Sequence, residues 1–96
     1  MDLEDRYQIT SNRESGFGRY DVIIEPKEKA DPAIIMEFKI QDQDENDLSQ
    51  TVEAALSQIE TKNYESVLTG KGIQSERIRK YGFAFRGKEI LIGEGK

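Results

Sequence analysis

Short runs of alternating apolar and polar residues predict β-strands along much of the chain, and one run has an unusual feature. Residues 33–40 (AIIMEFKI) are typical of a buried strand, yet they include two charged side chains. Because side chains alternate between the faces of a strand, Glu37 and Lys39 are expected on one face, with Met36 and Phe38 on the other. An unpaired buried charge is unfavourable. We therefore expect Glu37 and Lys39 to meet each other, a metal ion or a water-filled notch.

A second predicted strand, residues 19–25, has an acid near its start, Asp21. Two prolines and several charged residues in the connector 26–32 favour a turn between antiparallel strands. Such a hairpin would bring Asp21 back toward Glu37, and carboxylates with a neighbouring lysine can hold a hard cation beside an attacking water. The other predicted strands are residues 6–11, 80–86 and 88–92, the last two joined by a turn at Gly87 and Lys88.

One long helix is predicted over residues 48–69. Asp47, followed three residues later by Gln50, resembles a capping box at its start, and Gly70 is expected to end it. Apolar residues recur along one side of this segment, a pattern typical of a helix packed on a sheet. The residues of this stripe are Leu48, Val52, Ala55, Ile59 and Asn63, with Leu56 and Val67 nearby.

Polar residues of this helix lie beside the stripe. Gln58 and Lys62 are one turn apart at the border between the buried face and solvent, where they can overlook the strand ends. Tyr64 and Leu68 form a smaller apolar pair away from the stripe. The acidic segment before the helix, residues 41–47, lacks the glycine and final glutamate of an EF-hand loop, so we interpret it as a solvated linker.

Composition limits the chemistry that the chain can perform. At 96 residues there is room for one domain with a modest core. The absence of cysteine and histidine excludes disulfides, thiolate metal sites and the usual zinc ligands. No segment is long and apolar enough for a membrane span, and acids near the first residue contradict a signal peptide, so a cytoplasmic location is expected.

The charge is unevenly distributed. The net charge is −5, but residues 71–96 carry 7 basic and 3 acidic side chains, whereas residues 1–70 carry 7 basic and 16 acidic ones. Phosphate neutralisation dominates nucleic-acid binding, so the basic end could face a phosphate backbone. An ordinary solvated surface explains the same pattern.

Several motifs together resemble one family. Asp21, fifteen residues and then Glu37-Phe38-Lys39 resemble the Asp…Glu-x-Lys signature of the PD-(D/E)XK nuclease superfamily. Residues 12–21 (NRESGFGRYD) look like its bacterial branch found behind an ATPase-like domain. Residues 55–64 (ALSQIETKNY) and 81–88 (YGFAFRGK) extend the resemblance over nearly the whole chain.

The resemblance implies a metal-dependent nuclease that uses Mg²⁺ or Mn²⁺. Asp21 and Glu37 would bind the cation with the main-chain carbonyl of Phe38, and Lys39 would orient or deprotonate the attacking water. Further assignments by resemblance are Glu14 as an additional metal ligand and Gln58 as a supporting catalytic residue. Arg19 and Lys62 are candidates for phosphate contacts. Glu14 could equally be an ordinary exposed glutamate of residues 11–18, which we expect to form a loop or an irregular strand, and Arg19 could pair with a neighbouring acid.

The expected fold is therefore α/β (α+β), a restriction-endonuclease-like mixed sheet of four to five strands with one long helix. The superfamily core usually has a helix before its first strand, and we predict none here. Residues 1–96 would then be a single nuclease-like domain, either a C-terminal fragment or a trimmed family member. One helix covers only one face of the sheet. The other face would need a second copy of the chain or an upstream ATPase-like domain.

Three functions remain open on this basis. The first is phosphodiester hydrolysis of DNA or, as a second choice, RNA. The second is a non-catalytic module of an ATPase-linked protein that keeps the nuclease fold to bind nucleic acid or a partner. The third is a structural role, in which Glu37 and Lys39 form a salt bridge beside Asp21.

Overall fold

The described strands form one mixed sheet whose spatial order is the order of the sequence. The computed structural model describes residues 6–14, 19–28 and 30–95, and within them five strands pair in the order β1-β2-β3-β4-β5. Neighbours are antiparallel except β3 and β4, which are parallel because the helical segment crosses between them. The strands are β1 (Tyr7–Glu14), β2 (Arg19–Pro26), β3 (Ala33–Ile40), β4 (Ile78–Arg86) and β5 (Glu89–Glu94).

These bounds confirm the five predicted strands, although several of their ends differ: β1 extends to Glu14, β4 begins at Ile78 and β5 extends to Glu94. The β2–β3 and β4–β5 hairpins are present as expected, and Gly87 adopts a positive φ of 58° in the second turn. Of the loop or irregular strand predicted at residues 11–18, residues 11–14 continue β1, which pairs along its length with β2. We predicted no helix before β1. Residues 1–5, on which this prediction falls, lie outside the described residues.

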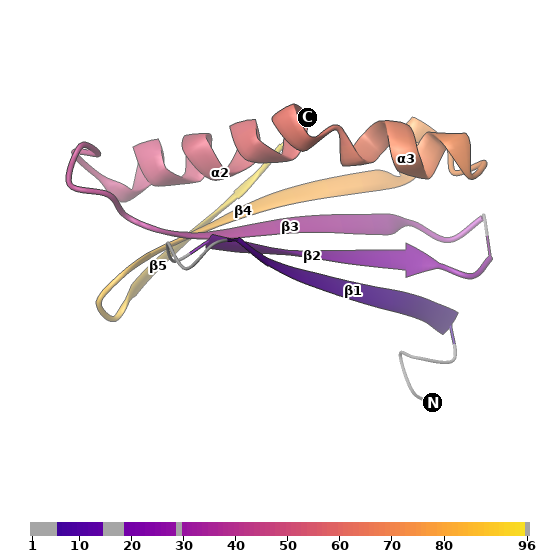
Figure 1. The fold of residues 1–96 in the computed structure, drawn as a ribbon, viewed down its shortest axis with the longest axis horizontal. Helices are drawn as coiled ribbons and strands as arrows, with labels where there is room; N and C mark the ends of the chain where they lie inside the picture. The colour runs from indigo at the N-terminus through magenta and orange to yellow at the C-terminus, as the bar shows by residue number, and fades with distance from the viewer. Residues whose placement is uncertain (1–5, 15–18, 29, 96) are drawn as a thin grey trace.

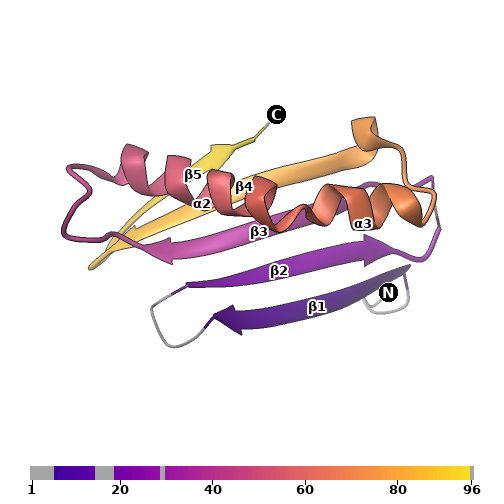
Figure 2. The same cartoon turned by 45° about the horizontal axis from the view of Figure 1, so that its top comes forward.

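The helical segment lies on one face of the sheet (Figure 1). It consists of α2 (Leu48–Lys62) and α3 (Tyr64–Gly70), followed by a short 3-10 turn at Ser75–Arg77. The N-cap prediction is confirmed, because Asp47 accepts a hydrogen bond from the main-chain N–H of Gln50 at 3.0 Å. The single continuous helix is not observed. The chain leaves helical geometry at Asn63, whose φ of 57° and ψ of 39° are left-handed, and α3 continues in a slightly different direction (Figure 2).

The hydrophobic core lies between the helices and the middle of the sheet. Ala33 and Ile35 of β3 are fully buried against Ile59 of α2, and Leu68 of α3 and Ile73 complete the cluster. Glycines bring α2 close to β4 and β5: a Cβ atom at Gly93 would lie 2.4 Å from Val52 Cγ1. No helix within the described residues is long and apolar enough to cross a membrane.

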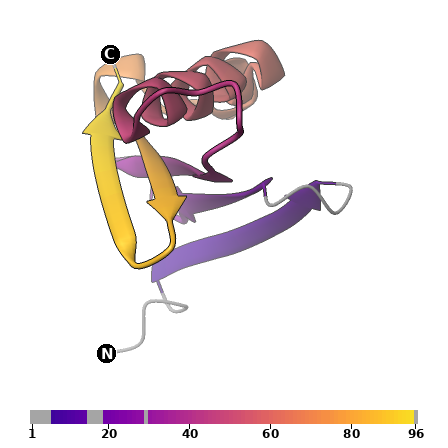
Figure 3. The same ribbon diagram turned by 90° about the vertical axis from the view of Figure 1, so that its left-hand side faces the viewer.

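The opposite face of the sheet is apolar and carries no helix among the described residues (Figures 1 and 3). We call it the open face. At its centre the rings of Tyr20, Phe38 and Phe83 stack with centroid distances of 4.5 and 4.6 Å. Strand register and alternation place the following residues on it: Ile9, Tyr20, Val22, Ile24, Ile34, Met36, Phe38, Ile40, Tyr81, Phe83, Phe85, Ile90 and Ile92.

Candidate active site

Two acids face each other across the β2–β3 hairpin. Asp21 and Glu37 are direct partners in the antiparallel register, so their side chains emerge side by side on the helix-covered face. Both side chains are 0% exposed. The predicted proximity of Asp21 and Glu37 is therefore what the hairpin produces. Two adjacent buried carboxylates repel each other, so the fold must supply donors or positive charge beside them.

Lys62 supplies positive charge to both acids. Its ammonium nitrogen lies 2.7 Å from Asp21 Oδ2 and 3.2 Å from Glu37 Oε1, and its side chain is only 17% exposed. Asp21 accepts two further hydrogen bonds, from the Tyr64 hydroxyl to Oδ2 at 2.9 Å and from Asn12 Nδ2 to Oδ1 at 3.0 Å. Burial and the hydrogen bond to Asp21 raise the pKa of Tyr64 to about 12, so the hydroxyl stays a donor at neutral pH.

The break at Asn63 explains how Lys62 and Tyr64 reach the same carboxylate oxygen. In a continuous helix, residues two apart point about 200° away from each other. The left-handed residue between them ends α2 and starts α3, so both side chains turn toward the sheet. Asparagine is one of the few residues that adopt this conformation readily. The helix break therefore assembles the donors around Asp21.

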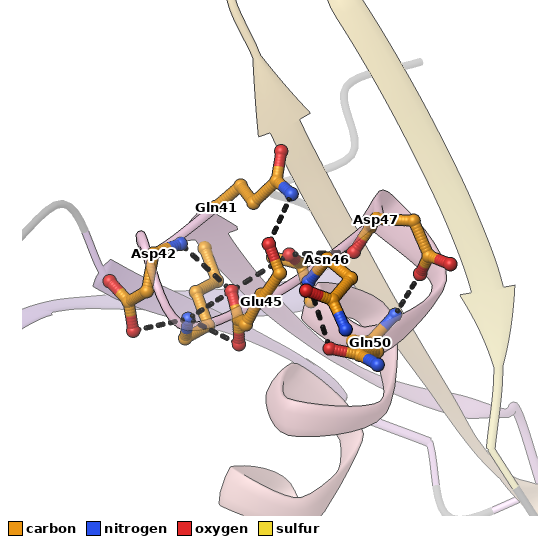
Figure 4. A network of polar contacts seen from close by, with 8 residues as sticks. Gln41, Asp42, Glu45, Asn46, Asp47 and Gln50 are labelled. Atoms are coloured by element: carbon orange, nitrogen blue, oxygen red, sulfur yellow. Dashed lines mark hydrogen bonds and ion pairs between the residues drawn. The ribbon is translucent and has the colours of Figure 1, made fainter.

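Lys39 has a different set of partners. Its ammonium donates to Asp42 Oδ2 and to both carboxylate oxygens of Glu45, each at 2.9 Å. Glu45 also accepts hydrogen bonds at 2.8 Å from the Thr51 hydroxyl and the main-chain N–H of Asp42, and Figure 4 shows Glu45 at the centre of this network. We call Lys39, Asp42, Glu45 and Thr51 the lysine cluster. It corrects the interpretation of residues 41–47 as a solvated linker, because two of its acids bind a buried lysine.

The same contacts bear on the structural alternative. Lys39 is on the same face of β3 as Glu37, as alternation predicts. Within the described residues, however, its ammonium pairs with Asp42 and Glu45 and makes no ion pair with Glu37. The Glu37–Lys39 salt bridge of the third functional alternative is therefore not the pairing in this structure. Lys62 is the described lysine that pairs with Glu37.

The structure describes the side chain of Gln58, but only the main chain of Glu14 and Arg19. Gln58 is half-buried on α2, one turn before Lys62. Within the described part of the chain, it makes no hydrogen bond to Asp21, to Glu37 or to the lysine cluster. The main chain pairs Glu14 with Arg19 at the end of the β1–β2 ladder that is nearest to residues 15–18. The side chains of Glu14 and Arg19 lie outside the described part of the chain. Lys62, a candidate for a phosphate contact, places its ammonium on Asp21 and Glu37.

Sequence reasoning missed several residues around this site. Asn12 and Tyr64 both belong to the motifs that carry the family resemblance, which is the signal that could have identified them. Tyr64 was interpreted as part of an apolar pair, and its ring does pack against the core while its hydroxyl reaches Asp21. Asp42 and Glu45 follow the buried Lys39 by three and six residues, a spacing that allows a loop to fold back onto the lysine.

Three cations of the basic C-terminal end pair with acids of the described residues. Lys71 pairs with Glu25 at 3.0 Å, and Arg79 lies 3.7 Å from Glu94. The nearly buried Lys80 pairs with Glu60 of α2 at 2.7 Å and Glu65 of α3 at 2.6 Å. These pairs fasten the helices to the strands and consume part of the excess charge, so they weaken the argument that this end faces a phosphate backbone.

The chemistry of the acids fits a hard divalent cation. Carboxylate oxygens are the ligands that Mg²⁺ and Mn²⁺ prefer, and Asp21 and Glu37 present oxygens close enough to share one ammonium. Within residues 6–14, 19–28 and 30–95, no group of three or more acidic side chains is arranged around one point. A third protein ligand would therefore come from the main chain or from a side chain outside the described set, such as Glu14.

An α+β sheet with a central parallel pair, helices on one face and two acids on neighbouring strands defines a restriction-endonuclease-like protein. The family model of the PD-(D/E)XK nuclease superfamily matches residues 1–95. The chain therefore belongs to the PD-(D/E)XK nuclease superfamily. Comparisons with curated proteins and with solved structures found no match.

Proposed function

We propose that this chain hydrolyses phosphodiester bonds of DNA with Mg²⁺ or Mn²⁺. The observation that carries the proposal is the register pairing of Asp21 and Glu37, two fully buried acids, in a chain of the PD-(D/E)XK nuclease superfamily. Burying two adjacent acids costs folding free energy. A metal-binding function would explain why the chain keeps them there. Members of this superfamily generally use divalent metals.

In this mechanism, Asp21 and Glu37 would hold the cation with the main-chain carbonyl of Phe38 and, as a proposed further ligand, Glu14. When bound, the cation would polarise the phosphate and activate a water molecule. Asn12 and Tyr64 hold the Asp21 carboxylate in a fixed orientation through one hydrogen bond to each oxygen. The half-buried Gln58 would support the site from α2, and Arg19 would contact the phosphate backbone.

Lys39 has the role of a positive charge near the reacting phosphate. It leaves β3 on the same face as Glu37, two residues further along, and the lysine cluster fixes its side chain. A fixed ammonium can stabilise negative charge that develops during the reaction without reorganising at that moment. Glu45 is a positioning residue in this mechanism, because it acts through Lys39.

A non-catalytic module is the second candidate function. The observation that favours it is the ammonium of Lys62 on both acids, which neutralises part of their charge without a metal. Such a chain would keep the nuclease fold to bind nucleic acid or a partner, including an upstream ATPase-like domain. For either function we propose a cytoplasmic location and a second copy of the chain, or that upstream domain, on the open face.

A nicking assay distinguishes the two functions. Supercoiled DNA should be nicked in Mg²⁺ or Mn²⁺ and not in EDTA, and the rate should fall about a hundredfold or more in Asp21→Asn, Glu37→Gln and Lys39→Ala. The exposed Asp44→Asn variant is a control that should keep full activity. Equal rates in all variants, or nicking that persists in EDTA, would contradict the metal-dependent mechanism.

A further inference from the structure

The ammonium of Lys62 occupies the space between the two acids. Its nitrogen contacts one oxygen of Asp21 and one of Glu37, at 2.7 and 3.2 Å. These are the carboxylates that would hold the cation. A cation that used the same two oxygens would need the space where the ammonium now lies, and two positive charges at such close range repel strongly. Lys62 and a metal ion on these two oxygens therefore exclude each other.

Lys62 is also placed to leave this position. It is the last residue of α2. Its side chain carries the ammonium on a flexible four-carbon stem, so the ammonium can move while the backbone stays in place. Its side chain is 17% exposed, whereas those of Asp21 and Glu37 are fully buried. The lysine thus has a route to solvent that the acids lack. The ammonium also lies 6.0 Å from the centroid of the Tyr64 ring.

We propose that Lys62 is a resident counter-ion that the metal displaces. In the metal-free protein it lowers the repulsion between Asp21 and Glu37 and keeps the β2–β3 hairpin and the end of α2 together. On metal binding it swings toward solvent and leaves a positive charge at the outer edge of the site. The displacement makes metal binding weaker than the two acids alone would allow. This inference rests on the proposed metal-dependent function.

The first test measures metal affinity without any nuclease substrate. Free Mn²⁺ is followed by electron paramagnetic resonance during titration of wild type, Lys62→Met and Lys71→Met. Competition predicts that Lys62→Met binds Mn²⁺ about tenfold more tightly than wild type, the usual scale of coupling between two ligands. Lys71→Met removes the same charge from a surface pair with Glu25, so it should bind like wild type. Adding Asp21→Asn to Lys62→Met should abolish the gain.

The second test uses wild type only, so it does not depend on the folding of a variant. Limited acylation with an N-hydroxysuccinimide ester, read by peptide mass spectrometry, reports the exposure of each lysine amine. Mg²⁺ should increase the labelling rate of Lys62 about tenfold and leave that of Lys71 unchanged. Labelling of Lys62 that does not respond to a saturating Mg²⁺ concentration would overturn the displacement.

The outcomes separate this inference from the proposed function. If wild type binds Mn²⁺ and Lys62→Met binds it no more tightly, the inference is wrong and the metal-dependent function stands. If neither binds Mn²⁺, both are wrong. Tight binding by Lys62→Met alone supports the resident counter-ion and favours the non-catalytic module as the function of the natural chain.

Discussion

Lys39 donates to both carboxylate oxygens of Glu45, at 2.9 Å each, so a loop before α2 fixes the lysine at the end of β3. Glu45 is only 14% exposed at its side chain, and it also accepts from Thr51, the buried fourth residue of α2. One glutamate therefore ties the central strand to the first turn of the helix. This contact is expected to stabilise the fold as well as orient Lys39.

The first prediction is that Glu45→Gln destabilises the fold in a pH-dependent way. Burial raises the pKa of Glu45, but the Asp42 N–H, the Lys39 ammonium and the Thr51 hydroxyl outweigh it, so the pKa lies below its ordinary value near 4.5. A carboxyl with a lowered folded pKa stabilises the fold above the unfolded value, and this contribution disappears as pH falls through the folded one. At neutral pH the variant should lose about 1–3 kcal/mol of unfolding free energy.

Urea unfolding at several pH values between about 7 and 3 checks this prediction. The difference between wild type and Glu45→Gln should be largest at neutral pH and shrink below pH 4.5. Glu53→Gln is a matched control, since Glu53 is exposed on the same helix. A difference that stays constant with pH would show that the carboxylate charge is not what stabilises the loop.

The second prediction concerns Asp21 in EDTA. Repulsion between Asp21 and Glu37 alone suggests that neutralising one acid stabilises the fold. The structure reverses the expected sign, because Asp21 accepts from Lys62, Tyr64 and Asn12. Removing these charge-assisted bonds should lower the melting temperature of Asp21→Asn by about 5–15 °C. Thermal melts with the exposed Asp44→Asn as control measure it. A higher melting temperature for Asp21→Asn would mean that repulsion dominates.

The sequence predicted the parts of the site that follow from local pattern. Strand alternation placed Glu37 and Lys39 on one face, and the proline-containing connector predicted the hairpin that aligns Asp21 with Glu37. The capping residue Asp47 was also identified, because N-cap signals are local. Each of these features depends on residues close together in sequence or on the geometry of a single turn.

The parts that were missed depend on tertiary context. Lys62 follows Asp21 by 41 residues, and its direction is decided by one left-handed residue, Asn63, in a segment whose pattern is helical throughout. Likewise, a run of acids has the same composition whether it is solvated or folded back onto Lys39. Only the position of β3 beneath the loop decides that Asp42 and Glu45 become its partners.

The third prediction tests the helix break at Asn63. A left-handed conformation costs most residues with a Cβ roughly 1–2 kcal/mol, a cost that glycine avoids and that asparagine reduces through local hydrogen bonds of its side chain. Asn63→Ala should therefore lower the unfolding free energy by about 1–2 kcal/mol. Asn63→Gly should change it much less, losing the hydrogen bond from the Ser66 hydroxyl to Asn63 Oδ1. Chemical denaturation of both variants gives the order, and a less stable glycine variant would show that the side chain matters more than the backbone.

The last prediction concerns the open face. Ile40 and Ile92 are each 56% exposed on it. The stacked rings of Tyr20, Phe38 and Phe83 lie beside them, since Ile92 pairs with Phe83 and Ile40 follows Phe38 on the same face of β3. Each large apolar side chain left in water forfeits roughly 1.5–3 kcal/mol of burial, so an exposed apolar face of this kind favours association with a second copy. Light scattering at micromolar concentration should give about twice the 11.0 kDa chain mass.

Lysine substitutions show whether this face forms the dimer. The double variant Ile40→Lys/Ile92→Lys puts charges on the open face without touching the core beneath the helices, so it should be monomeric and still folded. Val67→Lys is the matched control, because Val67 is similarly exposed, at 55%, but lies on α3. It should remain a dimer, since the helices cover the other side of the sheet. A wild-type monomer would mean that two copies do not cover this face, and a dimer that survives the double variant would place the contact elsewhere.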